Sequence, residues 1–564
     1  MASQWYSIPE WHGIQQQADG TLLPVTSAYD ARNMETGDGN LSVAKGYTKY
    51  KSVALPGSSA LLKLIVSKGA GKIYAVTSLT IYRWDDTNTT WATLKRPGTA
   101  TDFSFGTDIS ARQVDVLQTR IGSRDVILVC SGERQITKIY TEPPDDDTCE
   151  EFGAGLYSYT GAVSSYDTTS MTVTLSSAMN SEAQRRCLAY GITIADYYYD
   201  VYQVTDPTHV ALSSALLHTP SAGDDVTIRG GGSDAQVAYA ELYSNRLFAA
   251  GDPAAPYRLY WSSVPGGGRT VEDWLSVDGS ADASGGYVEV GDGAADNIIG
   301  LTALSNQLII WKRYSVWRLL GDRPSTYTLE RIDDESDLIS NSGVVVKYDT
   351  PYMLMPNGIS TYNGVSVVPV DGGIKYLRRF FEQNKPDVSN SRSAFWNNRL
   401  YMTCRANPNS AYEDTIIVYD ITRNSYMIRD GFQIADITAV GSEIYVLTQD
   451  RYMCKFEDGT DYDGTPISAY WYTQPIDFGK KMNRHQAQAI YSHITGDTVK
   501  VTVYGDYLDH AKNVTPLTAR AGYTTVRFQT DQQYFIQFKF ENISGGAFTL
   551  NGGVNIYVLS ELKP

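Results

Sequence analysis

Long apolar runs, basic clusters and sustained helical periodicity are all scarce in this sequence. No apolar run approaches the roughly 20 residues of a membrane-spanning helix, and the opening MASQWYSIPEWHG has neither the charged nor the apolar region of a secretory signal. No basic run is longer than a pair such as Arg378-Arg379. We therefore expect a protein made in the cytoplasm, with no membrane partner and no patch that grips nucleic acid phosphates.

Cysteine is rare as well, with five copies in 564 residues. Cys130, Cys404 and Cys454 each lie inside an apolar strand-like run, which favours small buried core residues. Their spacing fits neither a disulfide framework nor a zinc site. Cys149 and Cys187 are the one pair left that could join in an oxidising medium.

Tyrosine and glycine are abundant, with 41 and 48 copies, and the formal net charge is −16. Tyrosine favours strands and glycine favours the turns between them, so the composition predicts an all-β protein. The best helix candidate, Ile374 to Gln383, is short.

A hairpin unit repeats along the chain and is clearest between Val237 and Asp322. There the turns Ser244-Asn245-Arg246 and Ser305-Asn306-Gln307 separate apolar strands, and Asn tolerates the left-handed backbone of tight turns. Copies recur at Gly71-Lys72-Ile73-Tyr74, Asn398-Arg399-Leu400-Tyr401 and Ser442-Glu443-Ile444-Tyr445, and unit starts fall near residues 60, 113, 237, 297, 343, 393 and 437. Repeats of about 40 to 50 residues predict a β-propeller of about six to seven blades.

One interval between units is longer than the others by about 70 to 80 residues. It is bounded by Pro143–Asp147 and Gly230–Ser233, and short alternating strands lie between them, which predicts an inserted small β-barrel or sandwich. The expected domains are a lead-in with a strand that closes the last blade (1–59), blades (60–142), the insertion (143–235), further blades (236–458) and a C-terminal β-sandwich (459–564).

The insertion carries an aromatic run, Tyr197-Tyr198-Tyr199, followed by Tyr202. These rings could form a contact surface or pack a small core, and the sequence favours neither.

Propellers include glycosidases, so carboxylate motifs need testing. A partial match to the sialidase turn Ser-x-Asp-x-Gly-x-Thr-Trp has Asp86 and Trp91 in place, but Trp84 replaces Ser and Asn88 replaces Gly. Neither Asp85-Asp86 nor Asp333-Asp334-Glu335 is placed across a cleft by any pattern, as glycoside hydrolysis requires.

Metal and phosphate motifs are equally incomplete. His485 and His493 could share a strand face but lack further zinc ligands. Asp458, Asp461 and Asp463 only loosely resemble a calcium loop. Gly69-Ala70-Gly71-Lys72 opens a strand, unlike a phosphate loop. We therefore expect no catalytic, cofactor-binding or metal site, and no enzyme.

Three stretches resemble the tail-hub or nozzle proteins of short-tailed bacteriophages (podoviruses), a group that includes the packaged-DNA stabilisation proteins. The first is the opening ARNMETGDGNLSVAKGYTKY, with Asn33, Asp38-Gly39, Leu41 and Gly46-Tyr47 in the family's pattern. The second is the blade pair NRLFAAG to SVWRLLGD, and the third is the exit DGTDYDGTPISAYWYTQPIDFGKK. The ending GGAFTLNGGVNIYVLS also matches, so the resemblance covers most of the chain.

The resemblance implies a structural virion protein: a homo-hexameric ring around the DNA exit channel of the phage tail, which retains packaged DNA and conducts it at ejection. Its implied partners are a tail adaptor or portal-proximal ring protein, distal needle, plug or fibre proteins, and passing genomic DNA without tight binding. An acidic wall agrees, because it repels phosphates. The alternative is a phage tail-tip propeller that recognises a host surface glycan or protein.

Overall fold

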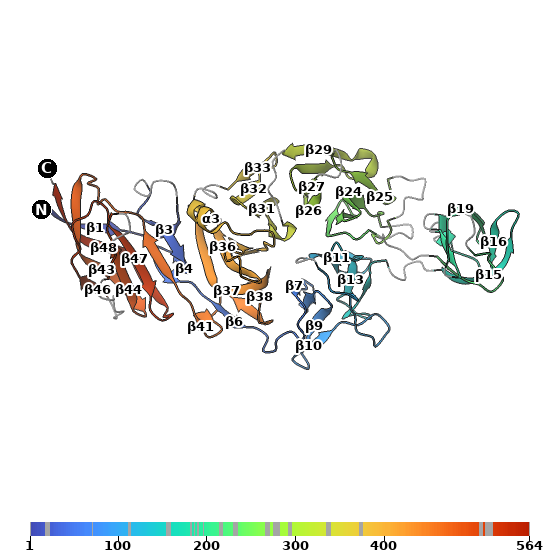
Figure 1. Cartoon of the computed structure of the whole chain (residues 1–564), viewed down its shortest axis with the longest axis horizontal. Coiled ribbons are helices and arrows are strands. Elements are labelled where there is room, and N and C mark those ends of the chain that lie inside the picture. The colour runs from blue at the N-terminus through green and yellow to red at the C-terminus, as the bar shows by residue number, and fades with distance from the viewer. Residues whose placement is uncertain are drawn as a thin grey trace. The chain divides into compact units, whose positions relative to one another are not determined.

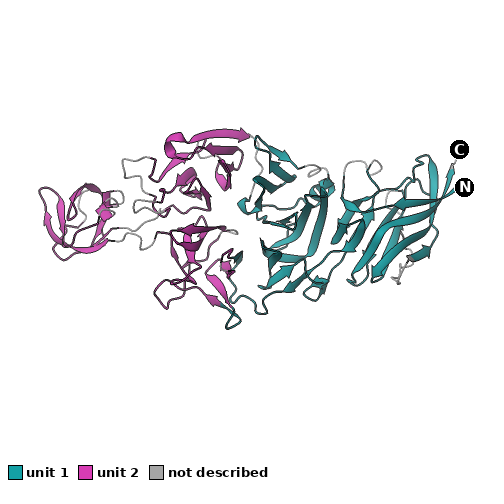
Figure 2. Cartoon of the chain, turned by 180° about the vertical axis from the view of Figure 1, so that it is seen from behind, with its two compact units in different colours: residues 1–66, 86–91, 337–564 teal, residues 67–85, 92–336 magenta. Residues whose placement is uncertain are grey.

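A computed structural model describes most of the chain. The described residues are 2–16, 23–69, 71–110, 114–153, 159–180, 183–184, 187–188, 191–195, 197–213, 218–228, 235–265, 271–274, 282–291, 296–333, 340–370, 376–506, 511–513 and 523–562. The chain forms two compact units, one of residues 1–66, 86–91 and 337–564 and the other of residues 67–85 and 92–336 (Figure 2). We call them unit 1 and unit 2.

Unit 2 contains three four-stranded antiparallel sheets whose spatial order follows the chain. Their strands are β11 (Asp115–Ile121), β12 (Arg124–Cys130), β13 (Thr137–Tyr140) and β14 (Thr148–Glu151); β22 (Tyr239–Tyr243), β23 (Arg246–Asp252), β24 (Ala255–Trp261) and β25 (Gly286–Glu289); and β26 (Ile298–Leu304), β27 (Gln307–Lys312), β28 (Val316–Leu320) and β29 (Thr328–Asp333). The hairpin of β8 (Ile73–Thr77) and β9 (Ile81–Asp85) belongs to the same unit, and β10 (Thr90–Thr93) follows it.

The predicted turns explain this up-and-down order. Ser244 and Asn245 have φ of 49° and 61°, and the strands that they join pair Tyr243 with Arg246. Leu304 and Gln307 pair in the same way across the next predicted turn. Two central residues with positive φ form the turn that matches the twist of a tight hairpin, so these hairpin predictions are confirmed.

A seven-stranded sheet occupies the long interval in unit 2 (Figure 1). Its strands are β15 (Tyr159–Asp167), β16 (Thr172–Leu175), β17 (Ile192–Ile194), β18 (Tyr197–Tyr199), β19 (Val201–Asp206), β20 (His209–Leu212) and β21 (Asp225–Ile228), in the spatial order β18-β17-β21-β15-β16-β20-β19. Its core, which includes Val173, Ile194, Val210 and Val226, forms a separate apolar cluster. An inserted β structure is therefore present.

The predicted boundary at residue 143 is too early. Thr148–Glu151 pair with β13, so the preceding sheet continues past the Pro-Pro-Asp turn before the new sheet begins. Proline and aspartate mark a turn in either case, and sequence alone does not distinguish a hairpin turn from a hinge. The second predicted hinge, Gly230–Ser233, lies outside the described residues.

Unit 1 contains blade-like sheets of the same type. The first comprises β30 (Val344–Lys347), β31 (Thr350–Met355), β32 (Gly358–Tyr362) and β33 (Val367–Pro369), and the second comprises β34 (Ser393–Trp396), β35 (Arg399–Cys404), β36 (Glu413–Asp420), β37 (Ser425–Val440), β38 (Glu443–Thr448), β39 (Met453–Phe456), β6 (Tyr47–Lys49), β40 (Asp461–Tyr462) and β41 (Thr465–Pro466). The strand β7 (Leu61–Val66) also lies in this unit.

Strand β37 is long and pairs with two different strands. Its first half pairs with β36 and its second half with β38. After β39, the sheet continues with β6 from near the N-terminus, where Tyr47 pairs with Phe456. The expectation that a strand from the lead-in completes the last blade holds for Tyr47–Lys49. Leu41 and Val43 belong instead to the sandwich.

The sandwich has two sheets, and both chain ends build it (Figure 1). Strands β1 (Ala2–Ile8), β4 (Met34–Gly37), β5 (Asn40–Val43), β43 (Asn483–Gly496), β46 (Tyr523–Arg527) and β48 (Phe548–Leu562) form one sheet, while β2 (His12–Ile14), β3 (Ser27–Arg32), β42 (Tyr470–Thr473), β44 (Val499–Tyr504), β45 (Ala511–Asn513) and β47 (Gln537–Asn542) form the other.

The expected domain boundary between the lead-in (1–59) and the C-terminal sandwich (459–564) was wrong for the described part of residues 2–43, because Ala2–Ile8 pair with β48 and Ser27–Arg32 with β42 of the sandwich. The side chains of Val501, Phe538 and Phe540 are buried in the sandwich, whereas Tyr534 is 40% exposed. One continuous apolar cluster includes residues of the sandwich and of the β34–β39 blades.

The helix prediction is confirmed with shorter bounds, as α3 (Arg378–Asn384). Two short 3-10 helices, η2 (Pro324–Thr326) and η3 (Asn341–Gly343), complete the described elements. All five cysteines are buried free thiols, so the interpretation of three of them as core residues is confirmed, and Cys149 and Cys187 form no disulfide. In the part of the chain that the structure describes, we find no helix with the length and hydropathy to cross a membrane.

Gly46 provides a test of how closely the lead-in packs. A Cβ atom at this position would lie 1.7 Å from the carbonyl oxygen of Asp461. We expect Gly46→Ala to destabilise unit 1 by about 1–3 kcal/mol or more, because backbone must move to make room. Gly37→Ala is the matched control, since its Cβ would meet only the Arg423 guanidinium at 3.5 Å. Equal melting temperatures for the two variants would contradict this packing.

Candidate functional site

Asn33 joins three segments that are far apart in the sequence. It is 1% exposed and has a left-handed backbone with φ of 52°, which asparagine tolerates better than most residues. Its amide nitrogen Nδ2 donates to Asp430 Oδ1 and to the Ser468 carbonyl, both at 2.8 Å. Its Oδ1 accepts from the Asp430 backbone N–H at 2.9 Å and from the Tyr462 hydroxyl at 3.2 Å.

Four charged residues beside Asn33 form a buried cluster, the ionic junction: Glu35, Arg399, Arg429 and Glu457. The Arg429 side chain is fully buried and donates to the Met34 carbonyl at 2.6 Å. Its Nη2 lies 3.8 Å from Glu35 and 3.6 Å from Glu457. Arg399 pairs with Glu35 at 2.6 Å. The junction therefore connects β4 to β35, β37 and the residue after β39.

Burial and charge act in opposite directions on the two carboxyl groups of the junction. Burial alone would raise the pKa of Glu35, but Arg429 and Arg399 outweigh it and hold that pKa below its ordinary value. Burial raises the pKa of Glu457 despite the attraction of Arg429. The arginines therefore hold Glu35 ionised, whereas Glu457 is the more deeply buried carboxyl group and the one whose charged form burial disfavours.

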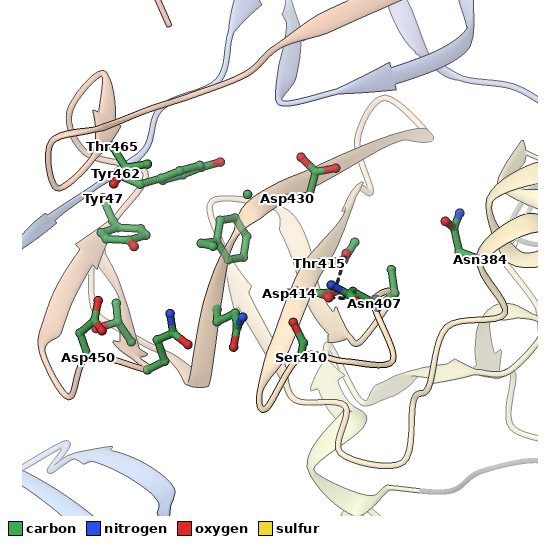
Figure 3. A pocket seen from close by; sticks show the side chains of 16 residues that line it. Tyr47, Asn384, Asn407, Ser410, Asp414, Thr415, Asp430, Asp450, Tyr462 and Thr465 are labelled. Atoms are coloured by element: carbon green, nitrogen blue, oxygen red, sulfur yellow. Dashed lines mark hydrogen bonds between the residues drawn. The ribbon is translucent and has the colours of Figure 1, made fainter.

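A pocket of about 670 Å³ opens next to the junction, between β6, β36, β37 and β40 (Figure 3). Tyr47, Tyr462 and Thr465 lie on one side, and Asp414 lies on the other, with Asp430 between them (Figure 3). The remaining lining residues are Asn384, Ala406, Asn407, Ser410, Thr415, Gly431, Phe432, Gln433, Thr448, Gln449 and Asp450. The described lining contains three carboxylates and no lysine, arginine or histidine.

Two of these carboxylates already have structural partners. Asp414 accepts the backbone N–H groups of Ala406 at 2.8 Å and Asn407 at 2.9 Å. Asp430 binds Asn33 and lies 3.5 Å from the guanidinium of Arg32, and burial raises its pKa above the ordinary value. Asp450 is exposed in the turn between β38 and β39. The pocket therefore presents hydrogen-bond acceptors and aromatic rings.

The motifs singled out in the sequence have structural partners elsewhere. The indole of Trp91 donates to the Val53 carbonyl at 3.0 Å, and Asp86 pairs with Lys51 at 3.2 Å. Lys72 pairs with Asp146 at 2.9 Å in unit 2 and opens strand β8. Ala70, Asp334 and Glu335 lie outside the described residues.

The candidate metal ligands do not converge. Both ring nitrogens of His485 have protein partners, the Ser560 hydroxyl at 2.9 Å and the Lys480 carbonyl at 3.1 Å. Asp458 accepts from the Thr48 hydroxyl at 2.5 Å, and Asp463 pairs with Lys49 at 2.6 Å. Asp461 accepts the Gly464 N–H at 2.8 Å, as in a solvated turn. Across the described residues, no three His, Cys, Asp or Glu side chains are placed to share a metal ion.

The tyrosines of the insertion agree with both expectations, a core ring and a contact surface. Tyr199 is buried, and its hydroxyl donates to the His218 carbonyl at 2.6 Å. Tyr197 is 44% exposed and stacks on the His218 ring, and Tyr202 is 75% exposed. The Tyr198 side chain lies outside the description. The run therefore provides one core ring, Tyr199, and two exposed rings, Tyr197 on β18 and Tyr202 on β19.

Sequence reasoning missed the ionic junction and the pocket. A signal for the junction was present, because Arg429 interrupts the apolar run SYMIRD and Glu457 follows the apolar MCKF. A charge within a strand that is otherwise buried requires a buried partner. The pocket has no local motif, since its lining comes from residues between 47 and 465.

Unit 2 has a perturbed carboxyl group of its own. Glu241 on β22 lies near Asp115 on β11, whose carboxylate accepts the Ala240 N–H at 3.1 Å. Burial, and then the charge of Asp115, raises the pKa of Glu241 from 4.5 to about 7. The folded state therefore holds a proton there that the unfolded chain releases at lower pH.

Comparisons with known proteins provide no family assignment. No family model matches the chain, and no curated protein matches it. Matching solved structures include the computationally designed Ika8 protein, with TM-score 0.34, 12% identity and coverage of 72% of this chain and 99% of that chain. The AfRom2 CNH domain gives TM-score 0.34 and 10% identity over 73% and 97%, and Kluyveromyces lactis Hsv2 gives 0.24 and 8% over 66% and 98%. Similarities this low carry no argument about function.

The ionic junction predicts a specific pattern of stability changes. We expect Arg429→Met to destabilise unit 1 by about 3–5 kcal/mol, because it leaves Glu457 buried without its counter-charge. The double variant Arg429→Met with Glu457→Gln should be more stable than Arg429→Met alone, since the lone buried carboxylate is gone. Denaturant unfolding of Arg429→Met, Glu457→Gln and the double variant measures this difference. A double variant that loses the sum of the two single losses would contradict the coupling.

Glu241 predicts a pH dependence with a defined sign. Because its pKa is about 7 in the folded state and 4.5 ordinarily, its contribution to stability should decline as pH rises from about 4.5 to about 7 and stay constant outside that window. Glu241→Gln should remove this decline, while Glu151→Gln, at an exposed position in unit 2, should keep it. Melting temperatures between pH 4 and 8 test the prediction, and parallel curves for wild type and Glu241→Gln would refute it.

Proposed function

We propose that this chain is a structural virion protein, the tail hub or nozzle of a short-tailed bacteriophage. In this proposal six copies form a ring around the DNA exit channel, retain the packaged DNA and conduct it at ejection. The propeller-type sheets and sandwich are compatible with that role, although folds of this kind serve many functions. The proposal therefore depends on particular residues.

The proposal rests on one observation. Residues from two of the stretches that resemble the phage hub family contact one another, and we call this contact region the joint. Asn33 and Gly46-Tyr47 come from the opening stretch, and Asp461-Tyr462 come from the exit stretch. Gly46 packs on the Asp461 backbone, Tyr47 stacks on Tyr462 with ring centroids 5.2 Å apart, and the Tyr462 hydroxyl donates to Asn33. The opening and exit stretches are far apart in the sequence, but both form this joint. Contact between them would explain why both stretches follow the family's pattern.

The charge of the chain supports a conduit that does not grip DNA. The formal net charge is −16, and a wall with this sign repels phosphates and leaves DNA free to slide. A closed ring of identical subunits requires a heterologous interface that repeats around the axis. In the proposal this interface forms on an adaptor or portal-proximal ring protein, and needle, plug or fibre proteins follow distally.

The proposed role is not enzymatic. Of the carboxylates that the sequence offered for glycoside hydrolysis, Asp86 is paired with Lys51 at 3.2 Å. Glycoside hydrolysis instead requires two carboxyl groups facing each other across a substrate.

A second candidate is a tail-tip protein that recognises a host glycan or protein. The exposed Tyr197 and Tyr202 of the inserted sheet favour it, because tyrosine is enriched in binding surfaces. These rings lie outside the joint that carries the resemblance, so the two candidates depend on different residues.

Loss of the protein separates the two candidates. If the chain is a hub, virions assembled without it should fill their heads and then lose the DNA, which yields empty, non-infectious particles without a distal tail. Nuclease protection of packaged DNA and electron microscopy measure this result. A Tyr202→Ala virion should keep its DNA and serves as the control. Full, stable heads with intact tails that fail to adsorb to cells would instead support receptor recognition.

A further inference from the structure

The pocket between β6, β36, β37 and β40 has an excess of hydrogen-bond acceptors. Gln433 lines it, and the buried Gln433 Oε1 has no hydrogen-bond partner. Among the described residues, the Asp450 carboxylate also has no protein partner. An unmet buried acceptor is unusual in folded proteins and indicates a missing donor. A ligand that supplies donors would satisfy Gln433 Oε1 and would also pair with the solvent-exposed carboxylate of Asp450.

The negative charge of the pocket lining restricts the class of ligand further. Asp414, Asp430 and Asp450 line the pocket without any lysine, arginine or histidine in its described lining. Three cations around the pocket are already paired, Arg32 with Asp430, Lys49 with Asp463 and Arg405 with Asp387. Anionic ligands are therefore disfavoured and cationic ligands favoured.

The aromatic side of the pocket suits a flat cation. Tyr462 and Phe432 are buried and pack edge-on at 5.1 Å, so Tyr47, whose ring stacks on Tyr462 at 5.2 Å, is the partly exposed ring of this side. A guanidinium group has five donors and no acceptor, binds carboxylates in a bidentate manner and stacks on aromatic rings. It therefore matches both sides of the pocket.

We propose that this pocket binds an arginine side chain carried by a segment of another protein. Its volume of about 670 Å³ lies within the range of ligand pockets, about 300–1,000 Å³, and exceeds what one side chain fills, so the flanking backbone of the segment has room as well. The proposal goes beyond the hub function and does not depend on it, because it requires neither a ring nor DNA.

The test uses two capped amino acids as probes for the full chain. N-acetyl-arginine amide and N-acetyl-citrulline amide have nearly the same shape, but only the first is charged. We expect saturable binding of the arginine probe in ligand-observed NMR titrations, weaker binding at high salt, and little binding of the citrulline probe. Methyl glucoside is titrated in parallel, because a sugar would also supply donors.

Two matched variants locate the binding. Asp450→Asn should weaken the arginine probe about two- to fivefold, as expected for loss of one exposed ion pair. Asp497→Asn changes an exposed turn aspartate of the sandwich and should leave affinity unchanged. Melting temperatures confirm that both variants are folded.

Several outcomes would overturn the proposal. Equal binding of the arginine and citrulline probes would show that charge is not recognised, and preferential binding of methyl glucoside would identify a saccharide site. No arginine binding, or the same loss in both variants, would show that this pocket is not the site. None of these outcomes bears on whether virions without the protein retain DNA, so the hub proposal is tested separately.

Discussion

The burial of Arg429 is the constraint on which unit 1 depends. A fully buried guanidinium is costly unless opposite charge lies close to it, and here that charge comes from Glu35 on one side and Glu457 on the other, while Nη1 donates to the Met34 carbonyl. Asn33 adds bonds to Asp430 across 397 residues of sequence. Residues 33–35, at the start of sandwich strand β4, therefore contact buried groups of the β34–β39 sheet, and separating them would leave these polar groups without partners.

Local patterns in the sequence predicted the blades well, because hairpins are short-range structures. Predicted unit starts near 237, 297, 343 and 393 agree with strands that begin at Tyr239, Ile298, Val344 and Ser393. The same reasoning failed for Ala2–Ile8, whose partner β48 lies at the other end of the chain. Alternation indicates which face of a strand is buried but does not identify the strand beside it.

The sequence did not predict the candidate site either, because here too the residues that contact one another are far apart in the chain. Tyr47, Asp430 and Tyr462 each belong to an ordinary strand or turn, and they acquire a common role only because β6 pairs with β39. The Arg429 signal was readable as a charge in an apolar run, but its partners were not. The ionic junction and the pocket that we assign to an arginine share strand β37, which carries Arg429 of the junction and Asp430 of the pocket.

The central claim is that this chain works as a ring at the tail axis. Electron cryomicroscopy of virions with the protein tagged at its C-terminus tests it most directly. The hub account predicts six tagged copies around the DNA exit channel, next to the portal-proximal ring. Tags found singly at fibre tips, or absent from the tail axis, would contradict it.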